Sequence, residues 1–122
     1  MKVIICGAGE VGKTLAEYLS KEKNDVTVID QSSEHLKEIN ENLDVNTFLG
    51  FGSQPSILEK AGAKNAEMLI AVTQSDEVNM IACEVGNSQF NIPLKVARVR
   101  DQDYLDPNYT SLFSKNQISV DL

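Results

Sequence analysis

The chain has 122 residues, which suits one domain that buries roughly two-thirds of its unfolded surface. Its formal net charge of -7 argues against a nucleic-acid surface, because phosphate backbones call for clusters of Lys and Arg and none is present. One histidine and two cysteines are too few for most zinc sites and nucleophile–base pairs. The longest apolar runs have strand length, so the sequence predicts no transmembrane helix and no signal peptide and favours the cytoplasm.

The first predicted element is an apolar strand, Lys2–Cys6, which runs directly into Gly7-Ala8-Gly9-Glu10-Val11-Gly12. This Gly-x-Gly-x-x-Gly pattern is typical of a dinucleotide-binding turn. Gly7 permits the tight turn, Gly9 permits close approach of a pyrophosphate, and Gly12 lets the next helix pack on the sheet. The helix start favours phosphate because its N–H groups and its dipole point there. The alternative is a tight turn that binds nothing.

The second predicted strand is Asp25–Asp30, and it ends in a carboxylate about 20 residues past the glycines, where a ribose diol lies in dinucleotide-binding folds. A carboxylate accepts hydrogen bonds from ribose hydroxyls and repels a 2′-phosphate. No Lys or Arg follows at Gln31, Ser32 or Ser33 to bind such a phosphate. Asp30 therefore predicts NAD(H) rather than NADP(H).

A helix capped by Ser32 or Ser33 follows, and it carries His35, which we interpret as a surface histidine. The third predicted strand, Val45–Leu49, leads into a sharply turned loop, Gly50-Phe51-Gly52-Ser53. A short helix then begins near Pro55 and stops at Gly62. Cys6 and Cys83 lie in apolar surroundings, which favours buried small hydrophobes over a metal or redox site.

The pattern then repeats with a continuous apolar strand, Met68–Val72, typical of the centre of a parallel sheet. Ser75 is expected to cap a helix that reaches about Gln89, with a buried stripe at Val78, Ile81, Ala82 and Val85. The remaining elements are predicted as a fifth strand over Lys95–Arg100, a weaker helix over Asp103–Lys115, and a sixth strand with Ile118, Val120 and Leu122.

This alternation predicts the α/β class, as a Rossmann-type, three-layer, doubly wound parallel sheet with strand order 3-2-1-4-5-6. Residues 1–122 are expected to form a single domain, and the apolar last strand suggests a fragment of a longer protein. The switch point between strands 1 and 4 would place Thr73 and Gln74 beside the glycine loop. They could contact ribose or phosphate there, or serve only to cap the next helix.

Arg98 and Arg100 share one face of the fifth predicted strand, where a guanidinium could reach a phosphate or pair with Asp76. No acid–base pair for hydride transfer is evident, so we do not expect an enzyme. A non-catalytic nucleotide sensor is the first hypothesis. The cofactor-binding half of an NAD-dependent dehydrogenase is the second, and a methyltransferase, whose glycine loop usually has another spacing, is the third.

Several segments together resemble the RCK (KTN) domain family, especially the amino-terminal domains of TrkA-type regulatory subunits of Trk potassium uptake systems. These segments are Gly7–Gly12, Val28–Asp30, Gly50–Ser53, Ala61–Met80 and Ala97–Arg100. The likeness covers nearly the whole chain, and Ala61–Met80 is its most specific part. Phe51 is a departure, because the family often has Asp at that position. An aromatic ring there can stack near adenine or simply pack.

The resemblance implies a cytoplasmic protein that is peripheral to the membrane through its partner, a potassium-transporter membrane subunit. It implies a homo-oligomer that binds NAD or NADH, with ATP or ADP as alternatives, and a further carboxy-terminal ligand-binding domain in the full-length protein. The predicted cofactor-binding residues are Gly7, Ala8, Gly9, Glu10, Val11, Gly12, Asp30, Gln31, Phe51, Gly52, Thr73, Gln74 and Arg98.

Overall fold

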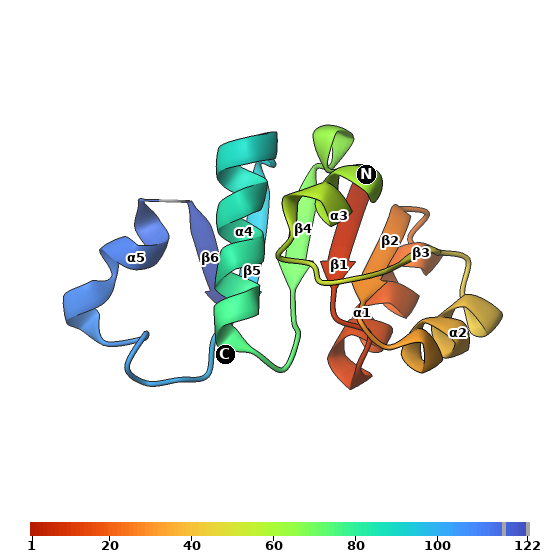
Figure 1. Cartoon of the computed structure of the whole chain (residues 1–122), viewed down its shortest axis with the longest axis horizontal. Helices are drawn as coiled ribbons and strands as arrows, with labels where there is room; N and C mark the ends of the chain where they lie inside the picture. Colours follow the sequence, from red (N-terminus) through yellow and green to blue (C-terminus); the bar gives the residue numbers. More distant parts are fainter. Residues whose placement is uncertain (116, 122) are drawn as a thin grey trace.

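The computed structural model describes residues 1–115 and 117–121, in which strands and helices alternate along the chain (Figure 1). The described strands are β1 (Lys2–Cys6), β2 (Asp25–Asp30), β3 (Asn46–Leu49), β4 (Met68–Ala71), β5 (Leu94–Arg98) and β6 (Ile118–Asp121). The helices are α1 (Glu10–Lys21), α2 (Ser33–Asn42), α3 (Pro55–Lys60), α4 (Asp76–Phe90) and α5 (Ser111–Ser114), with short 3₁₀ turns η1 (Ala63–Asn65) and η2 (Pro107–Tyr109).

Within these residues the strands form one six-stranded sheet in the order β3-β2-β1-β4-β5-β6, and every pairing is parallel. This arrangement confirms the predicted Rossmann-type, doubly wound fold. The order reverses at β1, where β2 pairs on one side and β4 on the other. All six carboxyl ends therefore lie along one edge, and the switch point lies between β1 and β4.

Helices cover both faces of the sheet, because alternate side chains of each central strand point in opposite directions. Val3 and Ile5 of β1 pack in one core cluster with residues of α1 and α2. Ile4 and Cys6 pack in the other cluster, with residues of α3, α4 and α5. Figure 1 shows α3 and α4 in front of the sheet. The continuous apolar character of β1 is thus explained by burial on both sides.

The buried face of α4 agrees with the predicted stripe only in part: Ala82 is buried as predicted, Val78 and Val85 are partly buried, and the prediction for Ile81 was wrong. Ile81 is 51% exposed, and the buried positions are Asn79, Ala82, Cys83 and Gly86. Two features displace the stripe. The Asn79 side chain finds backbone partners inside the fold, and a Cβ on Gly86 would lie 2.7 Å from Leu69 Cδ2, so only glycine allows this approach.

The segment after β5 also differs from its prediction. In place of one helix over Asp103–Lys115, the chain forms η2 and then the single turn α5. Asp106 caps the first piece by accepting the Asn108 backbone amide, and Pro107 occupies its first turn. The sixth strand is present as β6, and Leu122 lies outside the described residues.

Lys95, the second residue of β5, lies inside the core and is only 2% exposed. Its Nζ donates a hydrogen bond to the Ile92 carbonyl at 2.6 Å, just after the carboxyl end of α4. The sequence pattern placed Lys95 on a strand without indicating its burial.

Among residues 1–115 and 117–121, no helix combines the length and hydropathy that a membrane span requires.

Candidate functional site

The turn between β1 and α1 is shaped by contacts that exclude any side chain at two of the glycines. Gly7 has φ +117°, and a Cβ there would lie 2.9 Å from the Val72 carbonyl carbon and oxygen. A Cβ on Gly12 would overlap the Gly7 carbonyl oxygen and lie 2.7 Å from its carbon. Backbone lies against backbone at both positions, so β1, α1 and the end of β4 converge at one corner.

Gly9 stands apart from the other two glycines, because an added Cβ would meet no atom within 4 Å in the part of the chain that the structure describes. It is the N-cap of α1, and within the same residues no side chain caps that helix start. Glu10 and Val11 follow it and line a cavity of about 340 Å³. The first amides of α1 are therefore placed to bind an anion that Gly9 allows to come close.

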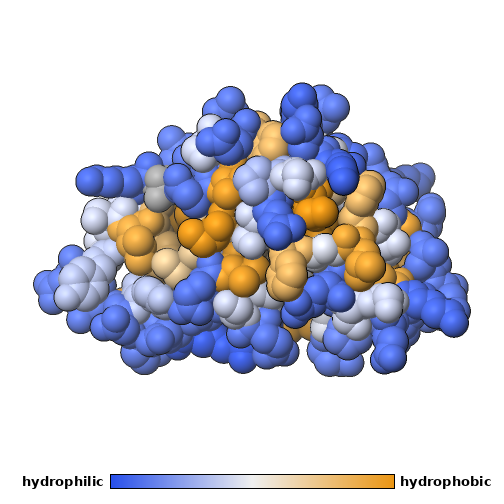
Figure 2. All heavy atoms as spheres, viewed as in Figure 1, coloured by the Kyte–Doolittle hydropathy of each residue, from blue (hydrophilic) through white to orange (hydrophobic). Residues whose placement is uncertain are grey.

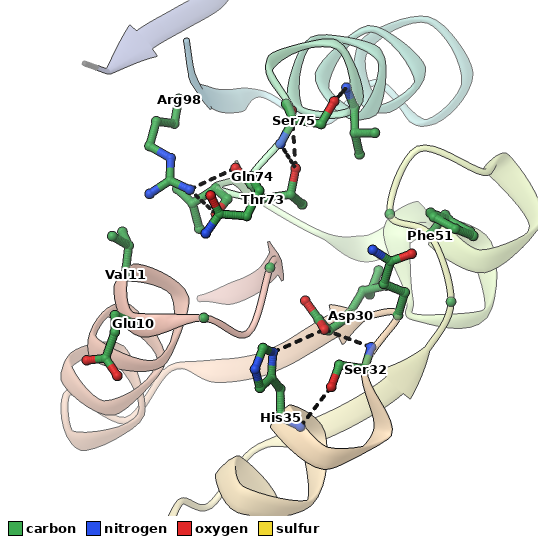
Figure 3. Close-up of a pocket in the computed structure, with 18 residues that line it drawn as sticks. Glu10, Val11, Asp30, Ser32, His35, Phe51, Thr73, Gln74, Ser75 and Arg98 are labelled. Atoms are coloured by element: carbon green, nitrogen blue, oxygen red, sulfur yellow. Dashed lines mark hydrogen bonds and ion pairs between the residues drawn. The ribbon is translucent and has the colours of Figure 1, made fainter. Parts of the chain in front are cut away.

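Asp30 forms one side of this cavity at the end of β2, as Figure 3 shows. One carboxylate oxygen accepts the Ala8 backbone amide at 2.9 Å, and the other accepts the Ser32 amide at 2.8 Å. The imidazole Nδ1 of His35 lies 3.6 Å from the second oxygen. The carboxylate thus ties the glycine loop to the start of α2. We refer to Asp30, Ser32 and His35 as the Asp30 wall.

The opposite side of the cavity follows β4, on the far side of β1 from Asp30. Thr73, Gln74 and Ser75 line it, together with Arg98 from the end of β5. The Arg98 guanidinium donates hydrogen bonds to the Val72 carbonyl at 2.9 Å and the Thr73 carbonyl at 2.8 Å (Figure 3). Behind them the buried Asn79 side chain bonds to Thr73. We refer to Thr73, Ser75, Asn79 and Arg98 as the Thr73 wall.

The loop after β3 completes the cavity between α3 and the Asp30 wall. Gly50, with φ +155°, is followed by Phe51, which is 48% exposed, and Gly52. A Cβ on Gly52 would lie 2.5 Å from Cys6 Sγ, so the loop rests directly on the end of β1. Burial raises the pKa of both the Cys6 and the Cys83 thiol, that of Cys83 to about 12. Both cysteines are buried, as predicted.

An ion pair joins the helices on the outer side of the Asp30 wall. Lys13 of α1 bonds to Glu38 of α2, and this partner lowers the pKa of the Glu38 carboxyl and raises that of the Lys13 ammonium. On the outer side of the Thr73 wall, the Tyr104 hydroxyl donates to Glu77 Oε2 at 2.7 Å and lowers the pKa of Glu77. The Lys13–Glu38 contact is therefore a pair of opposite charges, whereas the Glu77–Tyr104 contact joins a carboxylate to a neutral donor.

The structure brings the predicted cofactor-binding residues together in one cavity, apart from Ala8 and Gly12, which do not line it. Ala8 contributes its amide to Asp30, and Gly12 serves the close packing of α1. Arg100 lies after the end of β5. The Asp76 carboxylate accepts hydrogen bonds from the backbone amides of Arg100 and Asp101.

Sequence reasoning missed several lining residues: Gly50, Ser32, His35 and Ser75. Ser32 and Ser75 were expected only as helix caps, and both do cap, accepting the amides of His35 and Val78. His35 is 53% exposed at its side chain, so it is a surface residue as predicted and also part of the cavity. Its place one turn after Asp30 was the available signal.

The fold and the cavity at its switch point define a Rossmann-type domain of the nucleotide-binding class. The family model described as the TrkA-N domain matches residues 3–118, and the chain belongs to this family, which confirms the resemblance. Over all 122 residues it is 50% identical to the Trk system potassium uptake protein TrkA of Azorhizobium caulinodans and 49% identical to that of Halomonas elongata. The chain spans 27% and 26% of these two proteins.

Solved structures share the fold at low identity. The TrkA-N domain of the inner membrane protein ybaL from Escherichia coli has a TM-score of 0.83 at 20% identity, over 99% of this chain and 86% of that one. The GsuK channel bound to NAD gives 0.77 at 18% identity, over 98% of this chain and 21% of that one. The AMP-bound Kef CTD of Shewanella denitrificans gives 0.72 at 23% identity, over 99% and 72%.

Proposed function

We propose that this chain is a regulatory domain that binds NAD or NADH and thereby controls a membrane potassium transporter. The observation that carries the proposal is the Asp30 carboxylate, held beside the glycine loop by the Ala8 amide at 2.9 Å. Its second oxygen is held by Ser32, so the carboxylate stays in the cavity wall. A ribose diol on Asp30 would place the adjoining phosphates over Gly9 and the start of α1.

The charge pattern of the cavity supports a dinucleotide with two unphosphorylated riboses. Asp30 repels a 2′-phosphate, and Arg98 on the opposite wall supplies a positive charge near the phosphates. ATP and ADP remain alternative ligands, because they share the adenosine and the first phosphates with NAD. The GsuK channel and the Kef domain have the same fold. The first was solved with NAD, a dinucleotide, and the second with AMP, a mononucleotide.

The proposed mechanism is a shift between conformations and contains no chemical step. A nucleotide that binds two arrangements of the assembled protein unequally favours one of them, and the transporter subunit responds to that arrangement. The naming of the curated relatives as Trk system potassium uptake proteins supports this partner. We place the protein in the cytoplasm, at the membrane only through that partner, as part of a longer polypeptide.

We further propose a symmetric homo-oligomer. Figure 2 shows apolar residues gathered along the middle of the face that carries α3 and α4, with polar residues around them. Ile81 of α4 is an apolar residue that is 51% exposed. Light scattering of the purified protein should give a mass that is a multiple of the protomer mass, and a strictly monomeric protein would oppose this part of the proposal.

The second candidate is the cofactor-binding half of an NAD-dependent dehydrogenase, which the same cavity would serve equally well. Two observations disfavour it. The cavity lining holds His35 as its one imidazole, already placed against Asp30, and the two curated relatives reported above are named as potassium uptake proteins. Robust NADH oxidation by the full-length protein with a small substrate would restore this candidate.

Ligand-induced thermal stabilisation tests the nucleotide assignment. NADH at roughly 100 times its dissociation constant should add about 2.7 kcal/mol of stability, or several degrees for a domain of this size. The shift should disappear in Asp30→Ala and persist in Asp44→Ala, which removes an exposed carboxylate from the turn between α2 and β3. ATP and S-adenosylmethionine serve as competing ligands. If NADH shifts neither the wild-type protein nor any variant, the assignment fails.

Association with the transporter is a separate test. The full-length protein should co-purify with a potassium-transporter membrane subunit when both are produced together, and NADH should change the stability of that complex. Recovery of the two proteins in separate fractions at every nucleotide concentration would contradict the regulatory part of the proposal while leaving the nucleotide site intact.

A further inference from the structure

The Asn79 side chain is fully buried, and its orientation is determined by backbone groups on both sides. Its Oδ1 receives the Thr73 backbone amide at 2.8 Å, so that atom must be an acceptor. Its Nδ2 lies 2.8 Å from the Arg98 carbonyl and 3.2 Å from the Thr73 carbonyl, so that atom must be the donor. The reversed amide would place like groups against each other at all three contacts, which excludes it.

This orientation determines where the Thr73 hydroxyl proton goes. Thr73 Oγ1 lies 2.6 Å from Asn79 Oδ1 and 3.2 Å from the Ser75 carbonyl oxygen, and neither of these oxygens can donate. The hydroxyl therefore gives its one proton to an acceptor within the wall, and Asn79 Oδ1 is the nearer of the two. The Ser75 backbone amide donates to the same Oγ1 at 3.2 Å. A hydroxyl has one proton and two lone pairs, so a single lone pair is left. Any ligand group that reaches Thr73 Oγ1 must therefore bring a proton of its own.

We propose that Thr73 is a specificity-determining residue that accepts a hydrogen bond from a hydroxyl of the ligand's second ribose, and that Asn79 is the residue that positions it. This inference rests on the proposed function and names the part of the ligand that the Thr73 wall selects. Asp30 and Thr73 lie on the two sides of β1, with the glycine loop between them. A ligand with a sugar at each end and phosphates in the middle matches this order of acceptor, donors and acceptor.

A terminal phosphate does not satisfy the same position. At neutral pH its exposed oxygens are acceptors, and two acceptors facing each other repel. The Arg98 charge attracts both ligand kinds to this wall and attracts the more negative terminal phosphate more strongly, so charge does not favour the ribose. The hydroxyl proton makes the distinction, and it favours ADP-ribose and NAD over ADP and ATP.

The test compares ADP-ribose with ADP by calorimetric titration of the chain. ADP lacks the second ribose, and its terminal phosphate carries more negative charge. The wild-type protein should bind ADP-ribose about fivefold more tightly than ADP, the effect of one hydrogen bond to a neutral acceptor. Thr73→Val keeps the shape and removes the acceptor, so it should abolish the difference between the two ligands. Thr73→Ser keeps the hydroxyl and should preserve the difference.

A ligand-side measurement covers the case in which Thr73→Val does not fold. An ADP-ribose analogue without the two hydroxyls of its second ribose should bind the wild-type protein only as well as ADP. Equal affinities for ADP-ribose and ADP in the wild-type protein, or an unchanged preference in Thr73→Val, would overturn the inference and leave the nucleotide site standing. If NAD, ADP-ribose and ADP all fail to bind the wild-type protein, the proposed function itself fails.

Discussion

The two walls of the cavity are built by opposite means. The Asp30 wall depends on one charged side chain that receives two backbone amides from outside and remains 14% exposed. The Thr73 wall depends on a neutral, fully buried amide, Asn79, that joins the ends of β4 and β5 from inside the core. Solvent can replace a partner on the first wall and not on the second. We therefore expect damage at the Asp30 wall to affect ligand binding first, and damage at the Thr73 wall to affect folding first.

A substitution in the glycine turn between the two walls should have the largest effect on stability. Gly12→Ala forces a Cβ onto the Gly7 carbonyl and should lower the free energy of unfolding by at least about 3 kcal/mol. Gly9→Ala meets open space and should change stability by only about 0.5 kcal/mol, while weakening NADH binding because its methyl group projects toward the phosphates. Urea unfolding and calorimetric titration measure the two effects. Equal stability losses in both variants would contradict the geometry.

A matched pair of substitutions tests the two walls directly. Asn79→Ala removes the acceptor of the Thr73 amide and a donor to the Arg98 carbonyl at a fully buried position and should cost about 2–3 kcal/mol of stability. Asp30→Asn keeps one of two amide contacts at a partly wet position and should cost about 1 kcal/mol.

Ligand response should follow the reverse order. Asp30→Asn should lose most of the NADH-induced rise in melting temperature, and Asn79→Ala, measured well below its own melting point, should retain a larger share. If Asp30→Asn unfolds more readily than Asn79→Ala, the proposed contrast between the partly exposed Asp30 wall and the buried Asn79 of the Thr73 wall is wrong.

The smallest expected effect concerns acid sensitivity behind the Thr73 wall. The Tyr104 hydroxyl lowers the pKa of Glu77 below its ordinary value of 4.5. A carboxyl with a lowered pKa in the folded state stabilises the fold fully above its ordinary value, and that contribution is lost as the pH falls through the lowered value.

Tyr104→Phe should therefore melt slightly below the wild-type protein at pH 6 and together with it near pH 3. Tyr109→Phe, at another exposed tyrosine of the same segment, is the matched control and should follow the wild-type protein at both values. A gap that widens toward low pH would reverse the sign and contradict the assignment of Glu77.

Much of the fold could be predicted from local patterns, because most strands and helices are marked by their apolar period and their caps. The segment over Asp103–Lys115, which forms η2 and α5 instead of one helix, is the exception. Ser32 and Ser75 were expected as caps and act as such, and the sheet order followed from the strand–helix alternation. The stripe of α4 could not be read this way. Apolar periodicity assumes that polar residues face water, and Asn79 instead bonds to backbone groups of Thr73, after β4, and Arg98, at the end of β5.

Site residues could be predicted where the backbone geometry permits only one residue type. They were harder to predict where a side chain from another helix or strand lines the cavity. Gly7 and Asp30 were found from spacing, since a tight turn and a strand-end carboxylate have fixed places in this fold. Lys95 was not recognised as buried, because its acceptor is the Ile92 carbonyl after α4, which no spacing rule connects to β5. His35 joins the cavity only because α2 begins against Asp30.

The two hydrogen bonds that Asp30 accepts from Ala8 and Ser32 affect the entropic cost of nucleotide binding. These bonds hold the glycine loop and the first turn of α2 in position without a nucleotide. The side of the cavity that would bind the ribose is therefore preorganised. Little conformational entropy then has to be given up at this end, and more of the contact energy survives as affinity. Backbone movement on binding should accordingly be small here.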